Sequence, residues 1–316
     1  MRVIYVDSDE IFKKLRPILG DRLDALWLEY QLNPKRRSEI DGFLQLLAAK
    51  HLGKPFSAQP IFLDPPPPEL SEGEYTLGTV MYGEKPAGSF GLRDEWTGHV
   101  GVFGRTGSGK TNVGFLMART LLEKDVPFLV FDWKRNYRDL LRVFPVGALE
   151  VFTVGRSVAP FHFNPLIPPE GTSATVWLKK LIEIMCHVYW LGEGVAFLLQ
   201  NAIDASYRES AGRYPSLAGV QNKMSQMKVK GREAQWMDST RRVLGTLCYG
   251  EVGNVLNVGK SSDIAALLRR NVVLELDALT NSDKTFLIEA MLLWVHHYRL
   301  QQPARETFRH AVLIEE

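Results

Sequence analysis

The eight residues Gly104–Thr111 (GRTGSGKT) constrain the fold of this chain more than any other segment. They fit the pattern GxxxxGK[ST] at every fixed position, between an apolar run and a helical pattern. Glycines let such a loop wrap with its amide N–H groups pointing inward, and the helix that follows presents its positive end to phosphates. The segment therefore predicts a phosphate-binding loop, or P-loop, between a strand and a helix.

The residue types in the loop indicate ATP and Mg²⁺ as cofactors. We expect Lys110 to reach the β and γ phosphates and the hydroxyl of Thr111 to ligate Mg²⁺. The other expected nucleotide-binding residues are Gly104, Arg105, Thr106, Gly107, Ser108, Gly109 and Asn112.

From residue 99 onward, apolar strands alternate with helical segments. This pattern predicts an α/β fold with a mostly parallel sheet and helices on both faces. Strands are expected at 99–103, 128–131, 149–154, 271–276 and 310–314, and helices at 112–124, 174–208 (broken near 192–194), 221–247 and 282–300.

The preceding part of the chain differs in pattern. Residues 1–63 predict a small, mainly helical module with a short strand and two or three helices. A proline-rich linker follows at 64–70, and a short β segment at 71–98 carries strands at 75–82 and 88–92. Residues 99–316 are then expected to form a P-loop ATPase domain with a helical insertion at about 174–247.

Two predicted strands are candidates to supply the acidic residues that an ATP-hydrolysing P-loop site requires. The segment at 271–277 (NVVLELD) ends in Asp277, and the segment at 311–316 (AVLIEE) ends in Glu315 and Glu316. The second is chemically richer, because Glu315 could support Mg²⁺ through its water shell while Glu316 polarises the attacking water. Asp277 is equally well explained as an ordinary residue at the end of a strand.

Composition limits where the chain can act. Charged residues make up 23%, and the apolar runs are too short to span a membrane. The start, MRVIYVDSDE, lacks the basic and then apolar order of a signal peptide, so we expect the cytoplasm. We also expect Trp177, Trp190 and Trp294 to lie on apolar helix faces as core residues.

A net charge of +2 means that any DNA-binding surface must be local. The basic segment 221–242 is the best local candidate for such a surface, although a solvated helix face explains it equally well. A weaker candidate is formed by Lys134, Arg135 and Arg138. The candidate contacts in that segment are Lys223, Lys228, Lys230, Arg232, Arg241 and Arg242.

From Gly78 to its end, the chain resembles the HerA-like ATPases, which are related to FtsK-type translocases and conjugative coupling proteins. The resemblance rests, in order, on HVGVFGRTGSGKTN, FLVFDWKRNYRDL, FHFNPL, NVVLELDAL and VLIEE. It implies a RecA-like P-loop NTPase fold of the additional-strand type. It also implies that Glu315 is the metal-side acid and Glu316 the catalytic base, with Asp277 secondary.

The same resemblance implies an ATP-hydrolysing subunit of a homohexamer that translocates or unwinds double-stranded DNA. A nuclease or an antiviral effector is the implied protein partner. A nucleotide-binding scaffold or assembly subunit with little hydrolysis is the alternative. Family members begin with a small β-barrel where this chain looks helical, so we expect a different partner-docking module there. They also continue past the acidic pair with a sensor strand and a trans-acting arginine, so we expect a fragment.

Overall fold

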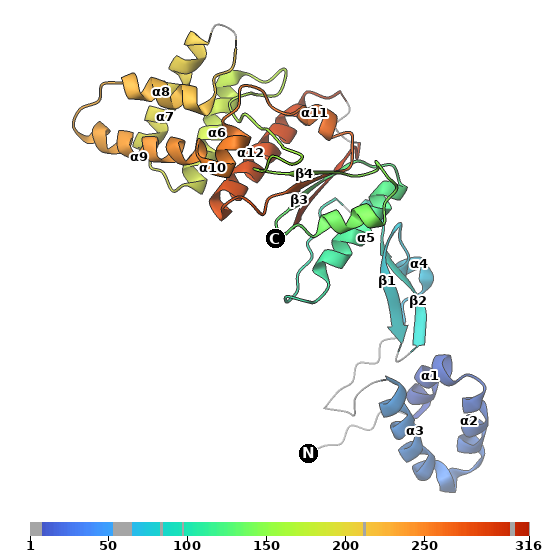
Figure 1. Ribbon diagram of the computed structural model, residues 1–316. Coiled ribbons are helices and arrows are strands. Elements are labelled where there is room, and N and C mark those ends of the chain that lie inside the picture. The colour runs from blue at the N-terminus through green and yellow to red at the C-terminus, as the bar shows by residue number, and fades with distance from the viewer. Residues whose placement is uncertain are drawn as a thin grey trace. The chain divides into compact units, whose positions relative to one another are not determined.

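The computed structural model describes residues 8–52, 65–82, 85–96, 98–210, 213–303 and 307–315 (Figure 1). The chain divides into two compact units, Met1–Thr120 and Leu121–Glu316, and the division falls within helix α5 (Lys110–Glu123). The short strand predicted near the N-terminus and the candidate base Glu316 lie outside the described residues.

The first unit begins with three helices, α1 (Ser8–Leu19), α2 (Arg22–Leu32) and α3 (Arg37–Leu52). Apolar residues one turn apart on α1 pack against both other helices, as expected of an amphipathic helix. The predicted helices are therefore present. The buried apolar residues of this cluster are Ile11, Phe12, Leu15, Leu23, Ile40, Leu44 and Ala48.

A short helix, α4 (Pro68–Ser71), precedes an antiparallel pair of strands, β1 (Tyr75–Tyr82) and β2 (Lys85–Leu92). Gly91 lies so close to Gly73 that an added Cβ would sit 2.7 Å from the Gly73 carbonyl oxygen. Both predicted strands are confirmed, and the second begins earlier than its sequence suggested.

The strand predicted at 99–103 is wrong. This segment has no strand conformation, and none of the described strands pairs with it. The side chain of Phe103 is 94% exposed. Gly98 and Gly104 flank the apolar run and Gly101 interrupts it, and so short a segment is not stable as a strand without a hydrogen-bonded partner.

The second unit is built on a parallel sheet of four described strands. Their spatial order is β4 (Glu150–Thr153), β5 (Val272–Glu275), β3 (Phe128–Asp132) and β6 (Ala311–Glu315). The two central strands are buried throughout, which explains their uninterrupted apolar sequences. The predicted α/β class and parallel sheet are confirmed.

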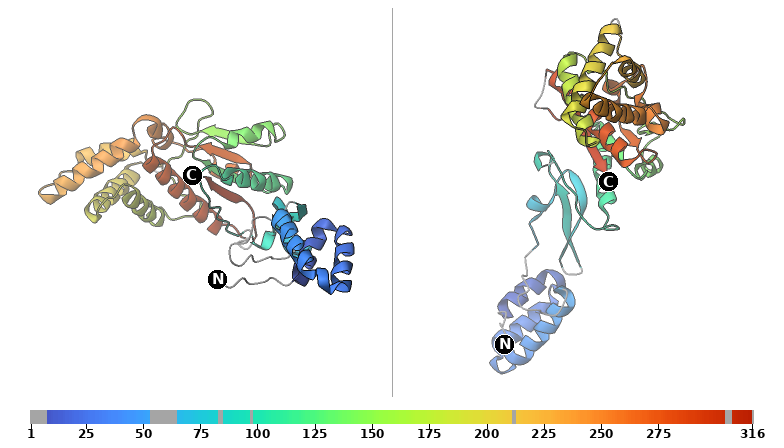
Figure 2. Two further views of the ribbon diagram at one scale, coloured as in Figure 1. Left: turned by 90° about the horizontal axis from the view of Figure 1, so that it is seen from below. Right: turned by 90° about the vertical axis from the view of Figure 1, so that its left-hand side faces the viewer.

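Helices pack on this sheet in a series. Leu129 and Leu274 of the sheet share one apolar core with Trp177 of α6 and Leu287 of α12, α6 contacts α7, and α7 contacts α8 and α9. The left view of Figure 2 shows this group extending away from the strands. The helices are α6 (Ala174–Val188), α7 (Glu193–Glu209), α8 (Leu217–Gln226), α9 (Arg232–Leu247), α10 (Gly250–Leu256), α11 (Ile264–Leu267) and α12 (Asn281–Leu300).

One predicted helix is divided. Residues 227–231 separate α8 from α9, because Met227 is extended and Gly231 has a φ of +61°, outside the helical region. No helix within the described ranges is long and apolar enough to cross a membrane.

The Asn-Pro-Leu segment has a structural role. Asn164 is fully buried, its Nδ2 donates to the Pro215 carbonyl oxygen (3.0 Å), and its Oδ1 accepts the N–H of Leu166 (2.9 Å). Trp177 Nε1 donates to the Pro165 carbonyl oxygen (2.9 Å). These bonds join α6 and the start of α8 to the same loop.

Candidate active site

The P-loop lies in the first unit, where Lys110 is the first residue of α5. Its Nζ donates to the carbonyl oxygens of Gly104 (2.8 Å) and Arg105 (3.2 Å). Gly107 and Gly109 have φ values of +80° and +92°, which side-chain-bearing residues rarely adopt. The glycine spacing of the motif therefore has a direct conformational cause.

Further contacts complete the loop. Ser108 N–H donates to the Arg105 carbonyl oxygen (3.1 Å), and Asn112 N–H donates to that of Gly109 (3.0 Å). The first turn of α5 carries no acidic residue, so its positive end is not offset by a carboxylate. Loop, lysine and helix end together fit a polyphosphate, and the Thr111 hydroxyl is of a type that could ligate a divalent metal ion.

In the second unit, three neighbouring strands end in a carboxylate at the same level. Asp132 of β3 is in register with Glu275 of β5 on one side and with Glu315 of β6 on the other. Of these three acids, only Glu315 was predicted as a site residue from the sequence. The available signal was that each apolar strand ends in an acid, as FLVFD and VVLE do.

Asp132 is held by the backbone that follows it. Its Oδ2 accepts the N–H of Tyr137 (2.8 Å) and its Oδ1 that of Lys134 (3.1 Å). Burial raises the pKa of this carboxyl group, and the backbone N–H donors act in the opposite direction. Asp132 therefore shapes the loop after β3.

Arginine side chains pair with the carboxylates of Glu275 and Asp277. Arg138 donates from Nε (2.6 Å) and Nη2 (2.5 Å) to the two oxygens of Glu275, which has no exposed surface. Asp277 pairs with Arg156 (2.5 Å) and with Arg135 (3.6 Å). Arg135 and Arg138, our weaker DNA candidates, are thus engaged with carboxylates.

Glu315, the metal-side candidate, lies near the same loop. Tyr137 is 2% exposed, and burial together with the nearby charge of Glu315 raises the pKa of its phenol. The described residues contain no group of three or more His, Cys, Asp or Glu side chains that could hold a metal ion.

The six basic DNA candidates do not form one cluster. Lys223 pairs with Glu209, whereas Lys228, Lys230 and Arg232 lie at the connection between α8 and α9. Arg241 is nine residues further along α9, which corresponds to about 14 Å of helix.

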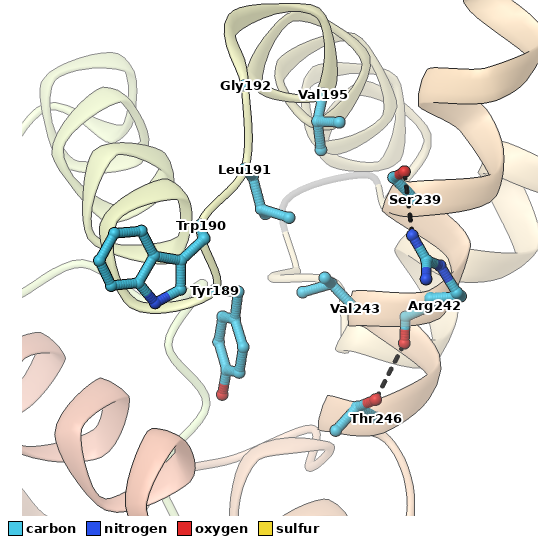
Figure 3. Close-up of a pocket in the computed structure, with 9 residues that line it drawn as sticks. All are labelled: Tyr189, Trp190, Leu191, Gly192, Val195, Ser239, Arg242, Val243 and Thr246. Atoms are coloured by element: carbon cyan, nitrogen blue, oxygen red, sulfur yellow. Dashed lines mark hydrogen bonds between the residues drawn. The ribbon is translucent and has the colours of Figure 1, made fainter.

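Arg242, the last of the six, lines a hollow of about 300 Å³ between α9 and the turn that joins α6 to α7 (Figure 3). Its Nη2 donates to Ser239 Oγ (3.3 Å). Trp190 lies at the edge of the hollow and is 94% exposed, so its prediction as a core residue is wrong. Trp190 follows the C-cap of α6 and has a φ of +55°, which is not helical. No helix face therefore directs its ring inward.

The P-loop and the parallel sheet define a P-loop ATPase. The sequence model described as helicase HerA, central domain, matches residues 75–234, about half of the chain. The chain belongs to this family, which confirms the expected resemblance and fold class.

Two solved structures are similar to this chain. VirB4 of Thermoanaerobacter pseudethanolicus is 13% identical with a TM-score of 0.45, over 66% of this chain and 80% of VirB4. The bacterial conjugative coupling protein TrwB, as TrwBdeltaN70, is 14% identical with a TM-score of 0.46, over 66% of this chain and 54% of TrwB. No curated protein sequence matches the chain.

Proposed function

We propose that this chain is the ATP-hydrolysing subunit of a homohexameric ring that moves double-stranded DNA, with a nuclease or an antiviral effector as its partner. The observation that carries the proposal is the P-loop, in which Lys110 begins α5 after two glycines with positive φ. A family described as helicase HerA, central domain, supports DNA as the substrate.

In this proposal Lys110 contacts the β and γ phosphates, and the loop amides hold the remaining phosphate oxygens. Thr111 ligates Mg²⁺, and Glu315 supports the ion through its water shell. Glu316 acts as the base that polarises the attacking water. Bound Mg²⁺ would neutralise charge on the phosphate oxygens.

The connection between α8 and α9 is the proposed DNA contact. Lys228 and Lys230 are exposed there, and Arg232 at the start of α9 stacks over Trp236 with 5.6 Å between guanidinium carbon and ring centroid. Flexible basic side chains of this kind neutralise phosphates without reading bases. Lys223 contributes less, because it already pairs with Glu209.

The helices of residues 8–52 are the proposed partner-docking module. Leu28 and Leu32 of α2 and Leu46 of α3 are each at least 60% exposed, which is unusual for leucines on helices that already share a core. We keep residues 64–70 as the linker and 99–316 as the ATPase domain in this proposal.

The test is ATP turnover with and without double-stranded DNA. We expect DNA to raise turnover, and expect Lys228→Glu with Lys230→Glu to abolish that increase. Charge reversal at the exposed Lys179 and Lys260 is the matched control and should preserve it. Turnover that DNA does not change would refute the DNA motor, and ATP binding without turnover would favour the nucleotide-binding scaffold.

A further inference from the structure

A second hollow, of about 300 Å³, lies between the last two turns of α12 and the residues that lead into β6. Its basic side chains are Arg299 and His296 on the helix and Arg309 and His310 before the strand. None of the described residues that line it is acidic. The other described lining residues are Val295, Leu300, Gln302, Thr307 and Phe308. The hollow therefore concentrates basic groups within the second unit.

The two arginines of this hollow have no carboxylate partner among the residues that the structure describes. Arg309 Nε donates to Thr307 Oγ1 (3.0 Å), and the guanidinium carbon of Arg299 lies 5.6 Å from the centroid of the Tyr298 ring. Charged side chains that are partly buried are usually paired with an opposite charge. Arg299 and Arg309 are instead two cations that line the same hollow.

These groups also act on one another. Burial and the charge of Arg309 lower the pKa of Arg299, and burial and the charge of Arg299 lower the pKa of His310 to about 4. His310 Nε2 is buried and has no hydrogen-bond partner among the described residues, whereas a buried nitrogen normally bonds to protein, water or an ion. A negatively charged group in the hollow would therefore be attracted by both arginines.

The hollow does not lie at the edge of the sheet that carries the candidate catalytic acid. His310 immediately precedes β6, and Glu315 is the last residue of that strand. A strand of this length spans about 13 Å. Because the described strands are parallel, Asp132 and Glu275 end at the same edge as Glu315. The hollow is therefore a separate site from the carboxyl edge of the sheet.

Phosphate is the anion that fits these side chains best. Each guanidinium offers several N–H donors in one plane, and a phosphate group has enough oxygens to accept from two arginines on different elements. A carboxylate has only two oxygens, and a single arginine can occupy both, as Arg138 does with Glu275. Arg309 and His296 are exposed, so a phosphate that belongs to a longer chain can reach the hollow.

We infer that this hollow binds a phosphate group through Arg299 and Arg309. The phosphate comes from a DNA strand or from a small phosphate compound, and both sources present the same chemistry to the arginines. Only the DNA source rests on the proposed function. With that source, the hollow is a second DNA contact in addition to Lys228 and Lys230.

The first test uses inorganic phosphate as the probe. Its affinity is measured by ³¹P NMR titration at constant ionic strength, in a Lys110→Ala background that weakens phosphate binding at the P-loop. We expect Arg299→Gln with Arg309→Gln to weaken phosphate binding at least about tenfold. Equal affinity with and without these two substitutions would overturn the inference.

The matched control is Arg208→Gln with Arg269→Gln, which removes the same charge from exposed arginines of the same unit. Arg208 lies in the last turn of its helix, as Arg299 does. The control should bind phosphate as strongly as the protein that keeps all four arginines. The same weakening in the control would mean that net charge explains the binding, and would also overturn the inference.

Stability separates loss of the site from loss of the fold. Because Arg299 and Arg309 repel each other, replacing both should not lower the urea midpoint in phosphate-free buffer. Phosphate should raise the midpoint only when the two arginines are present. If the double variant does not fold, Arg309→Gln alone replaces it, because this side chain is exposed. Unchanged phosphate affinity in that single variant would overturn the inference.

The second test identifies the source of the phosphate. Binding of a fluorescent DNA duplex is measured against salt concentration for the same variants. With DNA as the source, the variant without Arg299 and Arg309 should bind about fivefold more weakly, and its salt slope should fall by roughly one to two. Unchanged DNA binding together with lost phosphate binding would assign the site to a small phosphate compound.

A glutamate-rich peptide is the third probe. If the peptide bound through the two arginines and phosphate did not, the inference would be overturned in favour of an acidic protein partner. These outcomes are distinct from those of the proposed function. A protein that neither hydrolyses ATP nor binds DNA would refute the motor, and the phosphate titration would still decide whether the hollow is a phosphate site.

Discussion

Arg138 donates hydrogen bonds to both oxygens of the Glu275 carboxylate, which is completely buried and lies 137 residues further along the chain. A buried charge is costly unless it is paired and hydrogen-bonded. This pair therefore joins the loop that follows β3, residues 133–138, to strand β5.

Arg138→Leu should destabilise the protein by about 2 kcal/mol, because it strands the buried carboxylate. The loss is moderate because Arg138 is itself 39% exposed and Arg135 remains 3.6 Å from Glu275. The free energy of unfolding in urea measures it. Adding Glu275→Leu should recover most of the loss, and Arg142→Leu, at an 85% exposed side chain, should change stability by less than about 0.5 kcal/mol. No recovery in the double variant would argue against this pair as the cause.

Asn164→Ala should lower the free energy of unfolding by about 2–3 kcal/mol, because it removes two hydrogen bonds and leaves the Pro215 carbonyl oxygen without this donor. The same urea measurement applies. The control is Asn222→Ala on the exposed side of α8, which should have almost no effect. Equal effects of the two changes would contradict a structural role for the Asn-Pro-Leu segment.

Acid should weaken the second unit through His310. Burial and the charge of Arg299 lower the pKa of this histidine to about 4, below its ordinary value of 6.5. A depressed folded-state pKa means that the stabilisation is complete above pH 6.5 and is lost as pH falls toward 4, at up to about 1.4 kcal/mol per pH unit. We expect wild type to lose roughly 3 kcal/mol more than His310→Phe between pH 7 and pH 4. Parallel pH profiles of unfolding free energy would show this prediction to be wrong.

Gly109→Ala should weaken ATP binding about tenfold, because alanine at a φ of +92° strains the loop by roughly 1–2 kcal/mol. Isothermal titration with ATP and Mg²⁺ measures the affinity. Gly98→Ala is the matched control, since a Cβ there meets no atom within 4 Å and that glycine has no positive φ. If Gly98→Ala weakened binding equally, loop strain would not be the reason.

The sequence was most informative where local pattern decides structure. The helix after the P-loop, the strand ending in Asp132 and the helix ending at Leu300 were each predicted within a few residues, because apolar runs and turn residues mark their ends. The segment ending at Phe103 failed because a strand depends on a partner that its own residues do not reveal.

The P-loop residues could also be predicted, because the motif is contiguous. The hydrogen bonds of Arg138 to Glu275 could not, because they join residues 137 positions apart and depend on strand order and register. Arg135 and Arg138 are an example: the sequence shows them only as basic residues, whereas in the fold they pair with the buried carboxylate of Glu275.

The most direct test of the account is the steady-state rate of ATP hydrolysis with Mg²⁺ for wild type, Lys110→Ala and the exposed control Lys179→Ala. Lys110 is the residue whose ammonium the loop carbonyls hold at the start of α5. We predict measurable turnover for wild type and the control, and a fall of at least about 100-fold for Lys110→Ala. Equal turnover in all three proteins would contradict the claim that this P-loop is the site of ATP hydrolysis.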